Sequence, residues 1–271
     1  GGRTFPLLRL RTARPQVRWT HANLLVGQEM PLISGLNPVS PVAIGSPGFA
    51  AAGNLWLWLP QVRAGVERGG SLRLGAQAAV LAPTSGDPAG AFDTDNDIAE
   101  RSQRPFLQSR AYARWTSGLS VGEAGCGVHQ GWIVPVADRL SSFAVACDLL
   151  LPVRDWLEVR GEFFSGQALR GLGGGGIGQN VDATGAALRT TGGWAQVNLR
   201  PTFGIRVGAG CGVDHPKAGA SRRRNDACAA YATVRPAGPL FVGMEVRRIR
   251  TGYAAARYAN DHVTLAAGFE F

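Results

Sequence analysis

The chain has 271 residues, 45% of them hydrophobic, and its 28 Lys and Arg outnumber 19 Asp and Glu, which gives a formal net charge of +9. Mean hydropathy is -0.01, and no apolar run reaches the roughly 18 residues of a membrane-spanning helix, so a bundle of transmembrane helices is excluded. A basic chain often binds nucleic acid. Here the arginines are spread along the sequence, apart from one run at Arg222–Arg224 that is predicted to lie in a loop, so we expect no nucleic-acid partner.

Thirteen segments have a composition or a period-two alternation that is typical of β-strands, and none has a sustained helical period. Most run for about ten residues or more, which is long for a soluble protein but suits a tilted strand that crosses a membrane. In chain order the predicted strands are 4–14, 17–29, 54–68, 71–83, 104–116, 119–133, 141–153, 156–169, 192–200, 203–214, 227–235, 240–251 and 258–271.

The connections between these strands alternate in length. Short turns at one end and long loops at the other are typical of an up-and-down β-barrel in an outer membrane, where the short turns are periplasmic. Short connections are predicted at 15–16, 69–70, 117–118, 154–155, 201–202 and 236–239, and longer ones at 30–53, 84–103, 134–140, 170–191, 215–226 and 252–257.

Apolar and polar side chains alternate within the strands, so that in 71–83 Arg73 and Gln77 share one parity and leucine, alanine and valine the other. The apolar face can contact lipid, whereas charges at mid-strand are too costly in hydrocarbon and should face a wet lumen. The residues predicted to line this lumen are Arg9, Arg11, Arg63, Arg73, Arg110, Arg114, Arg160, Arg200, Arg206 and Arg247, with acids at Glu67, Glu123, Glu158, Glu162 and Glu245.

The tryptophans are predicted to form two girdles at the membrane interfaces, because none falls in the middle of a predicted strand. The alternative is a chance arrangement or a set of core anchors. Trp56, Trp58, Trp132 and Trp194 lie near long-loop ends, and Trp19, Trp115 and Trp156 lie near short-turn ends.

The last predicted strand ends on Phe271, and every second residue from Val263 to Phe271 is apolar. By itself such a strand also fits the edge of a soluble sandwich, but it resembles the closing strand of bacterial outer-membrane β-barrels. Four further stretches, Leu8–Ala13, Ala22–Gln28, Leu59–Arg63 and Glu245–Thr251, resemble porin-like outer-membrane proteins of the DcaP-like kind. The resemblance implies a barrel with a diffusion pore in the bacterial outer membrane, and it names no substrate.

The predicted strand count is odd, whereas single-chain bacterial barrels have even counts. We therefore expect residues 1–271 to be a single all-β, antiparallel, transmembrane barrel domain that lacks one or three amino-terminal strands. The intact barrel would then have about fourteen or sixteen strands. Alternatively, segment 4–14 is not a strand and the barrel has about twelve.

Two pairs of cysteines are candidates for disulfides. Cys126 and Cys147 flank one predicted long connection, and Cys211 and Cys228 flank another. Because the midpoint of each pair falls within its loop, the members can face each other on neighbouring strands, within disulfide distance. An oxidising periplasmic route would favour such bonds. The alternative, that these are small apolar residues on the lipid face, is left open.

No constellation of catalytic or metal-binding residues stands out. Gly171–Gly176 matches a dinucleotide-binding glycine pattern, but no helix is predicted after it, which favours a flexible surface loop. Asp214 and His215 would need a second acidic partner for acid–base catalysis, and the histidines lack metal-ligand spacing. We therefore expect no enzyme, no catalytic residue, no metal and no cofactor.

The predicted loop 30–53 is rich in proline and apolar residues. Three placements are open: a constriction inside the lumen, packing against a partner barrel, or packing over the barrel mouth. We hypothesise a porin-like channel for passive diffusion of small, preferentially anionic solutes, because rings of fixed cations raise the local anion concentration. The alternative is a non-transporting structural barrel or a subunit of an outer-membrane complex. Expected partners are outer-membrane lipid and the solutes, and a homo-oligomer is left open.

Overall fold

In the described part of the chain, thirteen antiparallel strands form a single sheet in which every strand pairs with its neighbours in the chain. The computed structural model describes residues 12–43, 47–86, 95–118, 120–217 and 219–269. The strands are β1 (Gln16–Arg18), β2 (Ala22–Glu29), β3 (Leu59–Gly69), β4 (Leu72–Leu81), β5 (Phe106–Ser117), β6 (Ser120–Ile133), β7 (Leu140–Arg154), β8 (Leu157–Gln167), β9 (Arg189–Thr202), β10 (Ile205–Pro216), β11 (Arg222–Ala237), β12 (Leu240–Tyr253) and β13 (Arg257–Phe269).

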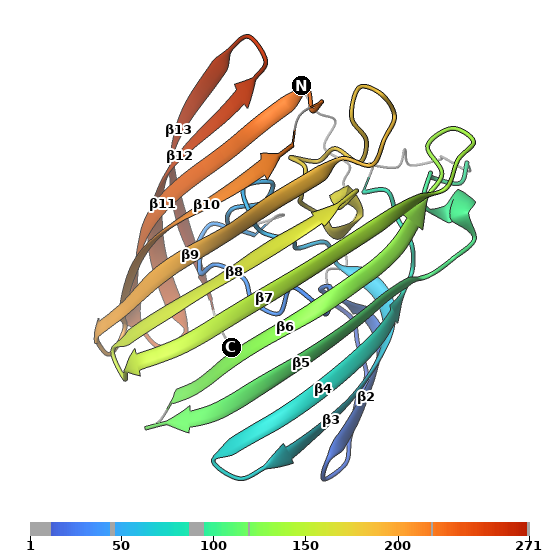
Figure 1. Ribbon diagram of the computed structural model, residues 1–271. Helices are drawn as coiled ribbons and strands as arrows, with labels where there is room; N and C mark the ends of the chain where they lie inside the picture. Colours follow the sequence, from blue (N-terminus) through green and yellow to red (C-terminus); the bar gives the residue numbers. More distant parts are fainter. Residues whose placement is uncertain (1–11, 44–46, 87–94, 119, 218, 270–271) are drawn as a thin grey trace.

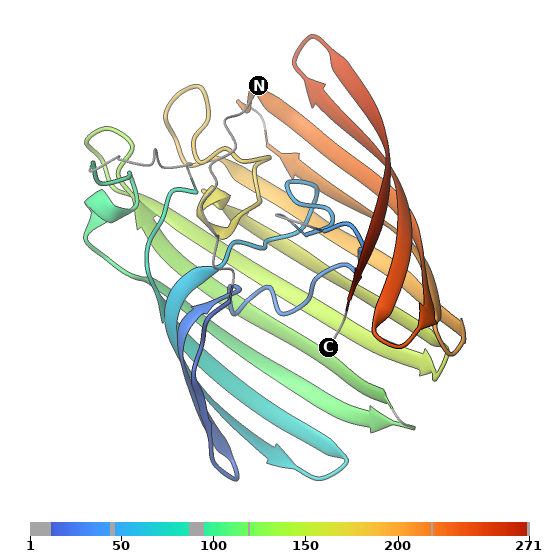
Figure 2. The same ribbon diagram turned by 180° about the vertical axis from the view of Figure 1, so that it is seen from behind.

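The sheet curls around an interior and is open along one side. Figures 1 and 2 show β2 and β3 on one side of this opening and β12 and β13 on the other. No ladder joins β1 to β13 within the described residues, so the sheet has two edges there.

The connections have the predicted up-and-down arrangement, with short turns at one end of the sheet and longer loops at the other (Figure 1). In the described part of the chain, helix is limited to two short 3-10 turns, η1 (Glu100–Ser102) and η2 (Arg170–Leu172). None of the helices described is long and apolar enough to span a membrane. The predicted all-β class and the antiparallel neighbour pairing are confirmed.

The first hairpin differs from the prediction. The turn predicted at 15–16 is wrong, because the chain instead turns directly after Trp19, whose N–H donates to the Ala22 carbonyl at 2.8 Å. Pro15 is tolerated before β1 because an edge strand needs no amide donor on its outer side. Most of the predicted strand 4–14 lies outside the described residues.

Two further strand starts also differ. β3 begins at Leu59 rather than 54, because the N–H groups of Trp56 and Leu57 donate to the Leu172 carbonyl, at 2.8 and 3.0 Å, and not to β2. The run Arg222–Arg224 was predicted in a loop but begins β11, since the ladder with β12 continues up to Tyr253.

The two faces of the sheet carry different side chains. On the outer face, large apolar residues are exposed, as Leu74 at 63% and Phe163 at 58% show. On the inner face, polar residues such as Gln196 and Asn198 are only 3% exposed. The strands therefore have the apolar exterior and polar interior that a membrane barrel requires.

The hydrophobic core lies inside the curled sheet, where two long connections fold inward. These are residues 30–43 and 47–58, here called the inner loop, and residues 168–188, called the second loop. Both loops join one apolar cluster with the inner faces of β5 and β8. Its most buried members include Leu32, Leu55, Phe106, Phe164 and Leu172, each at most 2% exposed.

The predicted tryptophan girdles are found only in part. Trp19 and Trp156, near the short turns, are 58% and 53% exposed. Trp194, however, is 4% exposed and points inward, where its indole N–H donates to Glu162 Oε2 at 3.1 Å. Trp56 and Trp58 belong to the inner loop and pack against each other, with ring centroids 5.4 Å apart. For these three residues the girdle prediction is wrong.

Disulfides join Cys126 to Cys147 and Cys211 to Cys228, each pair directly opposite in its ladder, with Cα–Cα distances of 4.0 and 4.1 Å. All four cysteines lie at outer-face positions. Cys126 and Cys147 have small and apolar neighbours there, whereas Cys228 lies opposite Arg248 on β12. The two interpretations that the sequence left open, disulfides and outer-face residues, therefore apply to the same four cysteines.

Removing one disulfide should lower stability without changing the fold. The variant Cys126→Ala/Cys147→Ala opens a link that spans 21 residues. The free energy of unfolding should fall by about 3 kcal/mol, because the unfolded chain regains loop freedom. Urea unfolding in detergent, followed by electrophoretic mobility, measures this change.

The matched control is Val128→Ala/Val145→Ala, the next outer-face pair across the same two strands. It removes comparable side-chain volume but no covalent link, so its effect should be smaller. Equal losses in both variants would show that the disulfide adds nothing beyond its packing.

Candidate pore lining and inner loop

The predicted lumen residues in the described part of the chain all occupy inner-face positions. This follows from the alternation of exposed and buried residues along their strands. Arg9 and Arg11 lie outside the described residues. The inner-face residues are Arg63, Arg73, Arg110, Arg114, Arg160, Arg200, Arg206 and Arg247, together with Glu67, Glu123, Glu158, Glu162 and Glu245.

One wall of the interior, from β3 to β7, carries a connected network of ion pairs. At its centre is Arg110, whose side chain is 4% exposed and which reaches Asp148 at 2.5 Å and Glu123 at 2.7 Å. A Cβ on Gly125 would lie 2.4 Å from Arg110 Nη2, so this glycine gives the guanidinium the space to lie flat against β6.

The network continues toward the short turns through Arg114, which bridges Glu123 at 2.7 Å and Glu67 at 2.8 Å. Arg73 reaches Glu67 at 3.1 Å, and the Tyr112 hydroxyl donates to the same carboxylate at 2.9 Å. Three arginines and three carboxylates therefore neutralise one another on this wall.

The inner loop is held inside the sheet by side chains that bind its backbone. Gln108 on β5 accepts a hydrogen bond from Leu32 N at 2.6 Å, and Glu162 on β8 accepts one from Leu36 N at 2.8 Å. Glu162 also accepts from the Ser34 hydroxyl at 3.0 Å. Because the loop has left the β-ladder, these side chains supply the partners that its buried amides need.

The same arrangement continues on the opposite wall. Gln196 on β9 pairs with both backbone groups of Val39, accepting from its N–H at 2.7 Å and donating to its carbonyl at 2.8 Å. Glu245 on β12 accepts from the Ser40 hydroxyl at 2.5 Å, and Asn225 on β11 donates to the Ala51 carbonyl at 2.8 Å. The inner loop thus crosses the interior from wall to wall.

Arg63 and Arg160 also bind the inner loop, and neither was predicted to do so. Arg63 donates to the Met30 carbonyl at 2.7 Å, and Arg160 donates to the Asn37 carbonyl at 3.1 Å. Both are therefore positioned by the loop and in turn hold it at two separate points.

The second loop packs on the inner loop. The predicted flexible surface loop around Gly171–Gly176 is wrong, because Leu172 is fully buried and its carbonyl accepts from two inner-loop amides. Gly173, at φ +86, approaches Leu57 so closely that a Cβ would lie 2.5 Å from Leu57 N. The glycine run allows this backbone contact.

Asp214 anchors the second loop, accepting from Ile177 N at 2.9 Å and from the Thr190 hydroxyl at 2.5 Å. Asp214 is fully buried on the inner face, whereas His215 follows it on the outer face. Since successive residues of a strand point to opposite faces, the two side chains do not form an acid–base pair.

A buried histidine links the two loops. The Gln108 amide donates to His129 Nδ1 at 3.1 Å, which assigns the ring proton to Nε2, and Nε2 then donates to the Ser142 hydroxyl at 3.1 Å. That hydroxyl donates to the Ala168 carbonyl at 2.8 Å. This chain of bonds runs from the inner loop to the second loop.

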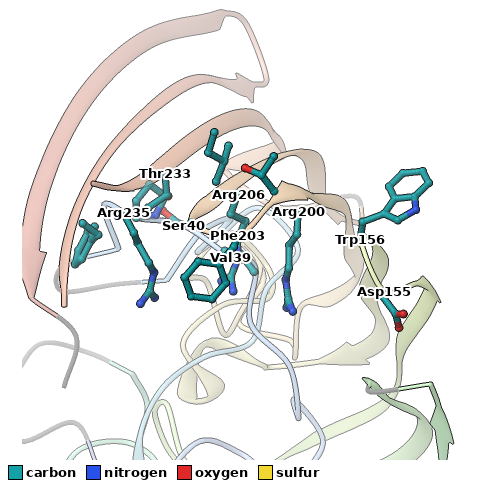
Figure 3. A pocket seen from close by; sticks show the side chains of 14 residues that line it. Val39, Ser40, Asp155, Trp156, Arg200, Phe203, Arg206, Thr233 and Arg235 are labelled. Atoms are coloured by element: carbon teal, nitrogen blue, oxygen red, sulfur yellow. The ribbon is translucent and has the colours of Figure 1, made fainter. Parts of the chain in front are cut away.

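A cavity of about 660 Å³ opens between the inner loop and the short-turn ends of β9 to β11, and we call it the lower cavity. Figure 3 shows Arg200, Arg206 and Arg235 pointing into this space, whereas Trp156 points away. Val39 and Ser40 of the inner loop line its other side.

Positive charge is in excess beside the lower cavity. Glu158 is bound by Arg160 at 2.6 Å and lies 3.9 Å from Arg200, so one carboxylate serves two guanidinium groups. Arg206 makes no ion pair with any other described residue. This wall therefore differs from the neutral network on β3 to β7.

Several residues that build the interior were not predicted. Arg235 shares the parity of Tyr231 and Thr233 on β11, so alternation alone could have identified it. Asp148, Gln108, Gln196 and Asn225 also lie on inner-face parities. Their bonds to Arg110 and to the loops, however, depend on pairings between distant strands that no sequence pattern reveals.

Comparisons with known proteins agree with this architecture. No protein-family model matches the sequence, and no curated protein matches it. Among solved structures, the outer membrane channel DcaP of Acinetobacter baumannii is similar, with a TM-score of 0.67 and 15% identity over 92% of this chain and 71% of that chain. A loop-deletion mutant of OmpT, an outer membrane protein of Vibrio cholerae, has a TM-score of 0.53 and 12% identity over 95% of this chain and 78% of that chain.

The predicted resemblance to porin-like outer-membrane barrels is therefore confirmed at the level of the fold. At identities of 15% and 12%, the comparison supports a shared architecture but does not identify the solute.

Releasing one anchor should loosen the inner loop. Glu162→Ala removes the acceptor for Leu36 N and the Ser34 hydroxyl. Amide exchange at Leu36 should become about tenfold faster or more, because a buried hydrogen bond to a carboxylate is lost. Hydrogen exchange read by mass spectrometry measures this directly.

The control is Gln77→Ala, which alters an inner-face polar residue on β4 that has no hydrogen bond to the inner loop among the described residues. In this variant the rate of amide exchange at Leu36 should match the rate in the unmodified protein. If Glu162→Ala also leaves this exchange unchanged, other contacts hold the loop and Glu162 is not an anchor.

Proposed function

We propose that the protein is an outer-membrane channel for the passive diffusion of small solutes, and that it prefers anions. The observation that carries this proposal is the excess of arginine beside the lower cavity. Arg160 and Arg200 share the carboxylate of Glu158, and Arg206 has no ion pair among the described residues, while Asp155 is the one acid among the residues that line the cavity. Placement in the bacterial outer membrane is supported by the apolar outer face and by the shared fold.

Anion preference is assigned to the lower cavity and not to the whole lumen. A fixed positive charge raises the local concentration of anions only where no carboxylate cancels it. Arg73, Arg110 and Arg114 are cancelled by ion pairs, and Arg247 is bound to Glu245 at 2.5 Å. Arg200 and Arg206 are therefore the residues on which selectivity depends.

The inner loop supplies the size limit. It crosses the interior at the level of Glu162 and Gln196, and the lower cavity lies between it and the short turns. We propose that solutes pass the loop along this arginine-bearing wall. Diffusion through such a passage needs no covalent step and no cofactor. We propose that the protein is not an enzyme.

A structural barrel that does not transport is the second candidate. It is favoured by the burial of the inner loop, in which Leu32, Ile33, Asn54 and Leu55 are at most 2% exposed. In this case the loop and the ion-pair network would fill the lumen, and the arginines would serve only to hold them.

Neutralising the lower cavity should shift selectivity toward cations. In a planar bilayer under a salt gradient, the full-length protein should give a reversal potential of the sign expected for anions. Arg200→Gln/Arg206→Gln should move this potential toward the cation side, because the uncompensated charge is removed.

The matched control is Arg248→Gln/Arg250→Gln, which removes two arginines from outer-face positions on β12. It should leave the reversal potential near its original value. Channels that prefer cations before any substitution would contradict the proposed selectivity, and the absence of any conductance would favour the structural barrel.

Anion preference should also weaken as salt rises. Fixed charges act over roughly 10 Å at about 0.1 M salt but over only about 3 Å at about 1 M. The ratio of anion to cation permeability should therefore approach that of free solution at the higher concentration. A ratio that is independent of salt would mean that selectivity does not arise from the fixed charges.

A further inference from the structure

The outer face of β11 to β13 is divided into a charged part and an apolar part. In the half of these strands nearer the short turns, the outer-face side chains are apolar. Ala230, Val246 and Val263 lie opposite one another on the three strands, and Met244 lies opposite Leu265. In the half nearer the long loops, six outer-face side chains are charged: Arg224, Asp226, Arg248, Arg250, Arg257 and Asp261. We call these six residues the arginine rim.

The boundary fixes where the rim lies relative to a bilayer. Charged side chains on a lipid-facing wall are costly at the hydrocarbon centre and tolerated at the level of the headgroups. Because the rim lies at the long-loop ends of its strands, it belongs to the outer leaflet (Figure 1).

The rim has more positive charge than its own acids can balance. Arg224 and Arg257 share Asp226, at 3.2 and 3.1 Å, and Arg248 lies 3.6 Å from Asp261. Arg250 is exposed and has no ion pair with another described residue. Four arginines against two aspartates leave a net charge of +2 on side chains that are mostly more than half exposed.

An apolar groove begins at the same place. This outer groove, of about 660 Å³, runs over β8 to β11 and has Arg224 and Asp226 at one end. Its floor includes Gly193, Ala195 and the disulfide-bonded Cys211, where small or absent side chains leave a hollow. The exposed ring of Phe163 also lines it.

We propose that the outer groove and the arginine rim together bind a phosphorylated lipid of the outer leaflet. One acyl chain lies in the groove, and the phosphate group pairs with Arg224, Arg248 and Arg250. Charge complementarity selects the headgroup, and the continuity of the groove with the rim selects a lipid over a free anion. This inference rests on the outer-membrane placement proposed above but not on the conduction of solutes.

Lipid binding is tested on the full-length protein in a non-ionic detergent, by native mass spectrometry during titration with diphosphoryl lipid A. Each arginine near an anionic headgroup contributes about fivefold in affinity, so Arg248→Gln/Arg250→Gln should weaken binding about 25-fold. The control Arg68→Gln/Arg154→Gln removes two exposed arginines at the short-turn ends of β3 and β7 and should bind as before.

The groove is tested separately with Ala195→Leu, which fills its floor from an outer-face position and leaves the interior unchanged. Binding of lipid A should fall, while conductance and electrophoretic mobility stay as they were. The control Ala78→Leu, on the outer face of β4, should have no effect on binding.

Three results would overturn the proposal: unchanged affinity in Arg248→Gln/Arg250→Gln, equal affinity for lipid A from which the phosphates have been removed, or complete displacement of the lipid by inorganic phosphate. Conductance is recorded on the same samples. Lipid binding without conductance would contradict the proposed channel function but would still support the lipid site.

Discussion

Hydrocarbon offers no hydrogen-bond partner to a backbone amide or carbonyl, and the rest of this structure depends on that constraint. The thirteen strands of the described residues satisfy it because each pairs with its neighbours in the chain. Once the backbone is paired in this way, side chains alternate between lipid and interior, and the polar ones accumulate inside.

The inner loop extends the same requirement into the lumen. Its backbone has no ladder, so Gln108, Glu162 and Gln196 replace the partners that a neighbouring strand would supply. Polar side chains on the inner face therefore have two uses. Some hold the loop, and others line the lower cavity, so the two groups are distinguished by their contacts and not by residue type.

Charge illustrates the same distinction. Counting inner-face arginines suggests a uniformly positive lumen, but Arg110 is held between Asp148 and Glu123 and contributes no net field. Arg206, which looks identical in the sequence, has no such partner among the described residues. The electrostatics of the barrel interior follow from the pairing of charges across strands that are far apart in the chain.

The strand pattern was readable from the sequence because alternation is a local property. Leu72 to Leu81 could be assigned to a strand, and Arg73 and Gln77 to its inner face, without knowledge of any partner. The errors occur where tertiary contacts override the local pattern. Residues 54–58 alternate like a strand, but the N–H groups of Trp56 and Leu57 donate to the Leu172 carbonyl. Trp194 is the residue type expected at a membrane interface, but its indole N–H points inward and donates to Glu162.

The two disulfides have a consequence for how these strands can pair. A shift of one residue between neighbouring strands moves every side chain to the opposite face, which in this sheet would place arginine in lipid and leucine in the lumen. Glycine-rich and alanine-rich strands such as β6 and β10 contain few large side chains to prevent such a shift. A covalent bond between Cys126 and Cys147, and another between Cys211 and Cys228, excludes it in two hairpins. The strands β5, β8, β9 and β12 pair directly with these two hairpins, so the two bonds fix the register in the middle of the sheet, from which the outer strands continue.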